Sequence, residues 1–457
     1  MLDGQKRELP YKKLPSMWNY LYPFIKDIPE PAARVTQFLS QSDAYRPGKK
    51  ALYVHIPFCD TICTFCPFIK STAYQEKLEP YVNALIKELK MIGSSPYIQQ
   101  FELGSIYVGG GTPSVLTPDM ITRLTSTIRE NFKLADDYEW TFEVEAKSAT
   151  EDKFKAMAAG GINRISFGVQ TFDPEYRKIF NLTATLDEVR NVRNMAEKYF
   201  KAYNMDLLYQ LPGQTLERLQ QDLDQAKELG CTSFDAYPLE YLVTAKGFLN
   251  LIKNGKIEMP PSANDKLEMQ EHIRRWALEN GYEQNYIYTF TRSDAKHKSW
   301  VFGETIYGVY EDEYIGCGQA AGSYLAGMAH NNHVTTDAYI HAVEAGELPV
   351  MQAYDYHAME KGLIYFPKKM TLSLDYLNSI KDRIDPFYLD KLAEFESLGL
   401  VRKEENQLVL TEEGKKYYMF MMVELLPADQ REIYMGYVTR AQEDRQWHEN
   451  LELISVE

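Results

Sequence analysis

The stretch YVHIPFCDTICTFCPF, residues 53–68, decides how the rest of this chain is interpreted. It begins in an apolar, β-rich run and continues into a loop in which Cys59, Cys63 and Cys66 are spaced Cys-x3-Cys-x2-Cys. The chain has five cysteines, so three of them fall within eight positions. Such clustering is a poor basis for a disulfide framework, and it indicates metal ligation in a reducing compartment.

The number of thiols suggests the kind of metal site. A structural zinc ion is closed by four ligands, and no fourth Cys or His lies near these three. Three thiolates around a four-iron cluster leave one iron open to a small molecule. Buried or idle thiols are the alternative interpretation.

Outward from this loop, short β-rich runs alternate with stretches of helical period, which predicts a parallel α/β sheet. Parallel sheets carry their sites at the carboxyl ends of the strands, so the loops after these runs are candidate site loops. The expected strands are ALYVHI (51–56), SIYVGGG (105–111), WTFEVEA (140–146), RISFGVQ (164–170), YNMDLLYQLPG (203–213) and SFDAYPLEYL (233–242), with helices over 81–92, 118–132, 152–159, 185–199, 216–229 and 269–278 between or after them.

The ends of the chain differ from this pattern. We expect four parts along the chain. Residues 1–50 would form an N-terminal arm and residues 51–260 the barrel core. Residues 261–360 would close over the active site, and residues 361–457 would form a C-terminal winged-helix-like domain. FYLDKLAEFESLGLVRKEENQLVLTEEGKKYYMF (387–420) carries the helix, turn and strand order of a winged helix. It holds about as many acids as bases, so a structural or protein-contact role is favoured over DNA binding.

Composition limits the partners. The formal net charge is −15 and no lysine or arginine cluster could track a phosphate backbone, so nucleic acid and anionic membrane surfaces are disfavoured. The N-terminus lacks an apolar signal run, and no apolar segment is long enough to span a bilayer. A cytoplasmic location is expected.

Several motifs together resemble a known family. The cysteine loop resembles that of the radical S-adenosylmethionine (SAM) superfamily, and YVHIPFC, GGGTPS, SFGVQTF and DLLYQLPGQT resemble the oxygen-independent coproporphyrinogen III oxidase family. The resemblance implies an α/β fold with a partial, six-stranded (β/α) barrel of the TIM type and a C-terminal α+β extension. It further implies a [4Fe-4S] cluster on Cys59, Cys63 and Cys66, with SAM chelating the open iron.

The same resemblance implies roles for other residues. The loop of Gly109, Gly110, Gly111 and Thr112 is expected against the methionine part of SAM, where glycine lets the backbone come close. Glu143, the acid of the third expected strand, would meet the amino or ribose groups of SAM. Gln170 and Asp206, at the ends of two further expected strands, would bond the ribose and methionine groups. The aromatic Tyr53 would lie beside the cluster.

Two positions depart from the family pattern. Leu182 stands where members often carry an arginine that pairs with the SAM carboxylate, and Arg164 and Arg177 are the alternatives. Pro67 and Phe68 follow the third cysteine, where coproporphyrinogen decarboxylases carry another cysteine close by. Decarboxylation is therefore disfavoured, and the lack of a short Arg-x-His element disfavours a haem chaperone.

The resulting expectation is an enzyme, a methyltransferase or an oxidoreductase, that cleaves SAM to a 5′-deoxyadenosyl radical. The favoured reaction is C-methylation or cyclopropanation of an aromatic small molecule with a second SAM; the alternatives are tetrapyrrole chemistry (coproporphyrinogen III decarboxylation or anaerobic haem opening) and a haem chaperone. The expected partners are a planar aromatic or tetrapyrrole substrate and a flavodoxin- or ferredoxin-type electron donor. Gln284 and Gln319 are candidate second-SAM contacts, and Cys317 is a candidate hydrogen-atom donor.

Overall fold

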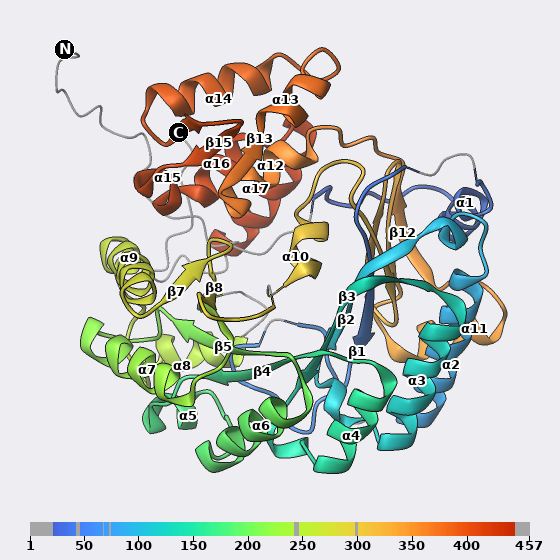
Figure 1. Ribbon diagram of the computed structural model, residues 1–457, viewed down its shortest axis with the longest axis horizontal. Helices are drawn as coiled ribbons and strands as arrows, with labels where there is room; N and C mark the ends of the chain where they lie inside the picture. The colour runs from blue at the N-terminus through green and yellow to red at the C-terminus, as the bar shows by residue number, and fades with distance from the viewer. Residues whose placement is uncertain are drawn as a thin grey trace.

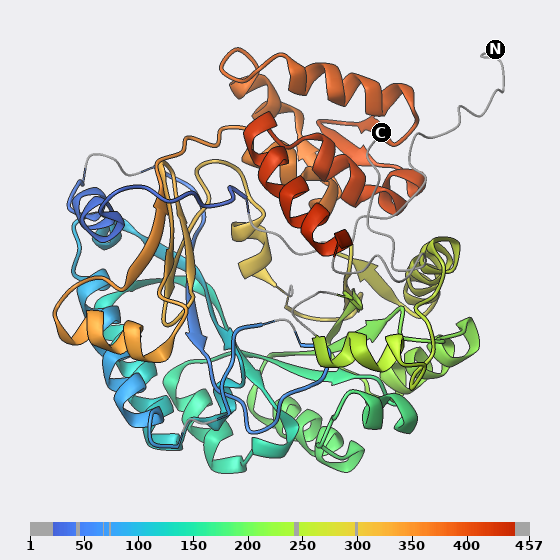
Figure 2. The same ribbon diagram turned by 180° about the vertical axis from the view of Figure 1, so that it is seen from behind.

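The computed structural model describes residues 22–42, 46–66, 68–72, 75–241, 246–297 and 300–443. A curved sheet with helices along its outer face forms the larger part of the molecule (Figure 1). A smaller C-terminal unit lies across the gap between the two edges of that sheet, and Figure 2 shows the same arrangement from behind.

Six parallel strands follow one another in chain order and form the centre of the sheet. Parallel strands covered on both faces are apolar along their whole length, and β1 (KALYVHI) is buried at six of its seven positions. The expected partial (β/α) barrel is confirmed. The strands are β1 (Lys50–Ile56), β2 (Glu102–Gly110), β3 (Lys133–Val144), β4 (Arg164–Gln170), β5 (Ala202–Tyr209) and β6 (Ser233–Pro238).

Helices on the outer face connect these strands, and their ends follow ordinary capping chemistry. The Thr185 side chain accepts from the Glu188 backbone N–H and the Glu188 carboxylate accepts in return, a capping box that starts one helix. Gly161 ends another at φ 95°, a conformation that favours glycine. The helices are α2 (Leu78–Gly93), α3 (Pro118–Asn131), α4 (Glu151–Gly160), α5 (Pro174–Ile179), α6 (Leu186–Tyr199), α7 (Leu216–Leu229) and α8 (Lys246–Lys253), with 3-10 turns η1 (Ile98–Gln100), η2 (Pro113–Val115) and η3 (Ala146–Ser148).

The region after residue 261 extends both edges of this sheet. One hairpin pairs antiparallel with β6, while the strand over Glu313–Cys317 lies parallel to β1 and leads into three antiparallel pairings. The sheet order is β12-β11-β10-β9-β1-β2-β3-β4-β5-β6-β8-β7. The added elements are α9 (Ala263–Glu279), β7 (Tyr282–Gln284), β8 (Thr289–Arg292), α10 (Val301–Ile306), β9 (Glu313–Cys317), β10 (Gly322–Leu325), β11 (Met328–Asn332), α11 (Thr336–Glu344) and β12 (Val350–Tyr354).

The C-terminal unit contains a three-stranded antiparallel sheet in the order β13-β15-β14, surrounded by helices. This arrangement agrees with the α+β extension predicted from residues 387–420. Its elements are α12 (Lys361–Lys369), β13 (Thr371–Ser373), α13 (Leu374–Ile380), α14 (Phe387–Ser397), β14 (Val401–Glu404), β15 (Gln407–Leu410), α15 (Glu412–Lys416), α16 (Tyr418–Glu424) and α17 (Ala428–Glu443). The arm contributes α1 (Pro31–Leu39).

Two apolar clusters hold these parts together. An aliphatic cluster, with Leu52, Val54 and Ile106 among its members, packs the strands against the outer helices. An aromatic cluster on the inner side includes Tyr288 and Trp300 and extends into the C-terminal unit. The inner side of the sheet is therefore rich in tyrosine and tryptophan.

Candidate active site

A cavity of about 240 Å³ lies at the carboxyl ends of the parallel strands, where such sheets carry their sites. It is lined by the cysteine loop, the loop after β2, and the ends of β3, β4 and β5. Most of the residues predicted as the site from the sequence meet here: Cys59, Cys63, Cys66, Gly110, Gly111, Thr112, Glu143, Gln170 and Asp206.

The cysteine loop is held at both ends and in the middle. The Cys59 backbone N–H donates to the Ser71 carbonyl at 3.1 Å, which closes the base of the loop. Farther along, the Thr64 N–H donates to the Phe180 carbonyl at 3.2 Å, and the Phe65 and Phe180 rings pack edge to face at 5.1 Å. The end of α5 therefore supports the loop that carries the thiols.

The thiols face the cavity without forming a single-ion site. Burial, together with the neighbouring Cys66 and Cys59, raises the pKa of the Cys63 thiol to about 12. Within the described ranges, no three Cys, His, Asp or Glu side chains converge as ligands to one ion. In a [4Fe-4S] cluster each thiolate binds a different iron, and metal binding releases the thiol protons, so three separated thiols suit a cluster better than one ion.

The glycine loop leaves no room for side chains beside the cysteines. A Cβ on Gly111 would lie 2.7 Å from the Phe58 carbonyl oxygen and 3.0 Å from the Cys59 sulfur. Gly110 has φ 119°, and a Cβ there would lie 2.8 Å from the His55 ring. The backbone after β2 can therefore approach a ligand closely only because these residues are glycines.

Glu143 places a carboxylate at the cavity wall. It accepts a hydrogen bond from the Tyr107 hydroxyl at 2.7 Å and from the Gly110 N–H at 3.2 Å. Burial raises the pKa of Glu143 to about 7, against the opposing effect of these two hydrogen bonds. The carboxyl group is thus oriented by its neighbours and accepts or releases a proton near neutral pH.

Gln170 ends β4, and Asp206 lies within β5, three residues before its end. The backbone of Gln170 has a left-handed φ of 68°. A Cβ added to Gly168 would lie only 2.4 Å from the side-chain amide nitrogen of Gln170, so the residue two positions before Gln170 has to be small. Asp206 accepts from the Asn204 amide at 2.9 Å. Burial, then the charges of Asp235 and Glu143, raise the pKa of Asp206 well above its ordinary value.

Tyr53 lies on β1 next to the cavity rather than in its lining. Its hydroxyl is 2.9 Å from His55 Nδ1, and its ring stacks against Tyr107 and Phe302 at centroid distances of 6.3 and 6.1 Å. Because Tyr107 also bonds Glu143, this aromatic stack connects the cavity wall to the inner aromatic cluster.

The positive groups at the cavity differ from the expected arginine. Leu182, which stands at the position of the expected arginine, lines the cavity. Arg177 lines it too, but its guanidinium donates to the carbonyls of Val169, Thr171 and Ala184. Arg164 bonds Thr141 and lies 3.9 Å from Glu139, away from the lining.

Two lysines in the lining were not singled out from the sequence. Lys70 and Lys147 both border the cavity with the three cysteines. Lys70 stands four positions after Cys66, and no sequence motif marks either lysine as part of a site.

Three candidate residues lie outside this cavity. The Gln284 amide donates to the Ile287 carbonyl at 3.0 Å, and the Gln319 amide bonds the Val334 carbonyl and the Thr336 hydroxyl at 2.8 and 2.7 Å. Cys317 is fully buried on β9, where burial raises its thiol pKa well above the ordinary value. Their contacts stabilise turns and strands and give no direct access to the cavity.

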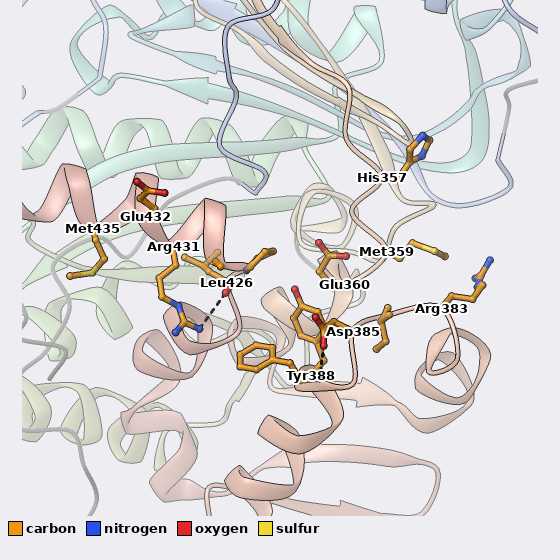
Figure 3. A pocket seen from close by; sticks show the side chains of 14 residues that line it. His357, Met359, Glu360, Arg383, Asp385, Tyr388, Leu426, Arg431, Glu432 and Met435 are labelled. Carbon is orange, nitrogen blue, oxygen red and sulfur yellow. Dashed lines mark hydrogen bonds between the residues drawn. The ribbon is translucent and has the colours of Figure 1, made fainter.

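A second cavity, of about 710 Å³, lies between the C-terminal unit and the connection from β12 to α12 (Figure 3). Glu360 and Tyr388 face each other across it, and Arg431 lies toward its other end. Acids and arginines both line this space, so its charge favours neither anions nor cations. It contains none of the predicted site residues.

Comparison with known proteins identifies the class. Residues 53–226 match the radical SAM superfamily, so the chain carries a radical SAM domain and is an enzyme whose reaction class this match leaves open. Such a domain implies a [4Fe-4S] cluster and SAM. The three thiols, the glycine cradle and the carboxylates in one cavity fit both groups.

The relatives place the chain among homologues of oxygen-independent coproporphyrinogen III oxidase. It is 27% identical to the haem chaperone HemW of Bacillus subtilis over 80% of this chain and 96% of that protein. It is 27% identical to anaerobilin synthase of Escherichia coli O157:H7 over 91% of each chain. It is 31% identical to oxygen-independent coproporphyrinogen III oxidase of Escherichia coli K12 over 56% of each.

A solved structure shares the fold over nearly the whole chain. Coproporphyrinogen III oxidase from Escherichia coli superposes with a TM-score of 0.74, at 24% identity, covering 91% of this chain and 96% of that chain. Within the part of the chain that is described, none of the helices has the length and apolar character needed to cross a membrane.

Proposed function

We propose that this chain performs radical SAM chemistry on a cyclic tetrapyrrole, and that the substrate is opened or oxidised rather than methylated. The observation that carries the proposal is the single cavity in which Cys59, Cys63 and Cys66 meet Glu143 and Asp206. Tyr107, which bonds Glu143 of the cavity wall, packs against an aromatic cluster on the inner side of the sheet, and aromatic rings of this kind suit a planar aromatic molecule.

Cys59, Cys63 and Cys66 would hold the cluster and leave one iron for the amino and carboxylate groups of SAM. When bound, the cluster and SAM supply a 5′-deoxyadenosyl radical that abstracts hydrogen from the substrate. The remaining work belongs to the chain, which must orient SAM, exclude water and hold the substrate beside it.

Side chains at the strand ends would perform this orientation. The Glu143 carboxylate, fixed by Tyr107 and Gly110, can accept a hydrogen bond from the SAM amino group. Gln170 and Asp206 offer an amide and a carboxyl group for the ribose and methionine groups. One SAM in this cavity is proposed, since Gln284 and Gln319 are engaged elsewhere.

The relatives support a tetrapyrrole as the substrate class. The three relatives named above are a haem chaperone, an anaerobilin synthase and a coproporphyrinogen III oxidase, and the anaerobilin synthase aligns with 91% of this chain. Pro67 and Phe68 occupy the position where decarboxylases of the family carry a further cysteine. Anaerobic haem opening is therefore favoured over coproporphyrinogen decarboxylation, and methyl transfer has no support among these relatives.

The test is a reaction under strictly anaerobic conditions. The full chain is reconstituted with iron and sulfide, reduced with dithionite, and mixed with SAM and either haem, coproporphyrinogen III or no second substrate. Formation of 5′-deoxyadenosine is followed by mass spectrometry, and tetrapyrrole loss by absorbance. Cys63→Ala is the control for the cluster, and Cys231→Ala is its matched control because Cys231 is buried away from the cavity.

We expect deoxyadenosine and loss of haem absorbance together, and at least a 100-fold reduction of both in Cys63→Ala. Tight haem binding without deoxyadenosine would contradict the enzyme proposal and support a chaperone. S-adenosylhomocysteine with a methylated product would restore methyl transfer.

A further inference from the structure

Lys70 is held at the far end of the cysteine loop with its ammonium group facing the loop backbone. Its Nζ donates to the Cys66 carbonyl at 2.6 Å and to the Phe68 carbonyl at 3.0 Å. The side chain is half-buried and lines the same cavity as the three cysteines. The positive charge is thus fixed beside the thiols rather than free in solvent.

The charges around the thiols oppose one another. The carboxyl groups of Asp60, Glu143, Glu145 and Asp206 line the cavity together with the thiols, and Lys70 is a cation in the same lining. Lys70 therefore compensates negative charge on the side of the cavity where acids predominate.

Other cations at the cavity are placed differently. Arg177 also faces Cys63, but three backbone carbonyls bind its guanidinium, so it is required to fold the loop after β4. Lys147 is exposed at the rim. Leu182 adds no charge where related proteins carry an arginine.

We propose that Lys70 is a positioning residue that holds a positive charge against the cluster and raises its reduction potential. This inference rests on the proposed cluster site. Reduction adds a negative charge to a group that already carries three thiolates, and a nearby cation stabilises the reduced form more than the oxidised form. Partial burial of Lys70 strengthens the effect, because a charge pair near a protein surface interacts more strongly than one in bulk water.

Two substitutions separate charge from hydrogen bonding. Lys70→Gln keeps an N–H donor for the loop carbonyls but removes the charge, whereas Lys70→Arg keeps the charge. Lys147→Gln is the matched control, a charge removed from the rim of the same cavity. The reconstituted full chain is titrated electrochemically without substrate, and the reduced cluster is followed by electron paramagnetic resonance.

We expect the ratio of reduced to oxidised cluster in Lys70→Gln to fall about tenfold at the wild-type midpoint, a shift of about 59 mV for one electron. Lys70→Arg and Lys147→Gln should titrate close to the wild type. Glu145→Gln, which removes the opposing charge and keeps an acceptor for the Ser148 N–H, should shift the potential upward.

The inference is overturned if Lys70→Gln titrates with the wild type, or if Lys147→Gln shifts as far as Lys70→Gln. If Lys70→Gln assembles no cluster, the Glu145→Gln variant provides the test. An unchanged reduction potential in Glu145→Gln would exclude an effect of charge on the cluster at this wall of the cavity. A wild-type chain that assembles no four-iron cluster would instead refute the proposed function.

Discussion

Glu143 is a buried carboxyl group whose protonation should couple stability to pH. Its pKa is raised from 4.5 to about 7 in the folded protein. Between these values the folded state binds more protons than the unfolded state, so stability falls as pH rises through 7. The sign is opposite to that of a carboxylate stabilised by an ion pair.

We therefore predict that the cluster-free protein loses about 1.4 kcal/mol of stability between pH 6 and pH 8 through Glu143 alone. Glu143→Gln should remove this increment, so its melting temperature should fall less over that interval. Scanning calorimetry of both proteins at the two pH values measures the difference. Glu88, whose pKa is also raised to about 7 by burial, contributes equally to both proteins and cancels. Parallel pH profiles would refute the prediction.

At the scale of single residues, the sequence predicted the cavity better than the roles around it. Cys59, Gly111 and Glu143 could be placed together because each lies at the end of a strand or follows one, and the carboxyl ends of parallel strands meet. Lys70 was missed, since a lysine four positions after a cysteine carries no pattern of its own. Gln319 was predicted to contact a second SAM from the resemblance of YIGCGQAAGS to a family region, whereas its amide bonds Val334 and Thr336, and no local signal reveals those long-range contacts.

Among the elements, the start of α10 is hydrogen-bonded to the sheet by a buried acid. Glu139 on β3 accepts from the Trp300 N–H at 2.8 Å and from the Phe302 N–H at 3.4 Å, and it lies 3.9 Å from the Arg164 guanidinium. These contacts place the Phe302 ring against the Tyr107 ring, with 5.0 Å between the ring centroids. The start of α10 is thus connected to the residue that orients Glu143.

We predict that Glu139→Ala destabilises the protein by about 3 kcal/mol, because two buried N–H groups and a buried guanidinium lose their acceptor. Glu139→Gln, which retains one acceptor oxygen, should lose less. Urea unfolding followed by tryptophan fluorescence measures the change, with the exposed Glu404→Ala as a control. An alanine variant that unfolds at the wild-type urea concentration would show that α10 is held by packing alone.

Element boundaries were predictable where hydrophobic period and caps agreed. RISFGVQ coincides with β4, and the helix predicted over 118–132 coincides with α3 to within one residue. By contrast, β3 begins at Lys133, well before the predicted 140, because KLADDYE is too polar to signal a strand and is ordered by its pairing with β2. Tertiary pairing overrides local propensity there.

At the scale of the whole molecule, the far edge of the sheet was not predictable from the sequence. β9 lies parallel beside β1, although more than 250 residues separate the two strands in the chain, and β10 and β11 then add antiparallel beyond β9. Only long-range pairing specifies that arrangement, and YIGCGQAAGSYLAG signals no more than a Gly-rich segment. The C-terminal unit was predicted because its helix, turn and strand order is local.

Basic side chains of this C-terminal unit form ion pairs with acidic side chains of the same chain. On α14, Lys391 pairs with Glu394 and Glu424, and on the neighbouring hairpin Arg402 pairs with Glu404. Lys416 of α15 pairs with Glu271 of α9. Acids thus compensate the bases that a DNA-binding winged helix would present to phosphates.

We predict that the full chain does not bind duplex DNA, with a dissociation constant weaker than about 10⁻⁴ M at physiological salt, the weak limit of non-specific binding. The reason is electrostatic. A chain of net charge −15 releases few counterions from DNA, and its acidic side chains are repelled by the phosphates. Fluorescence polarisation of a labelled 30-base-pair duplex at 50 and 150 mM salt measures binding. Saturable, salt-dependent binding that Lys403→Ala weakens would contradict the prediction and assign the winged-helix-like unit to nucleic acid.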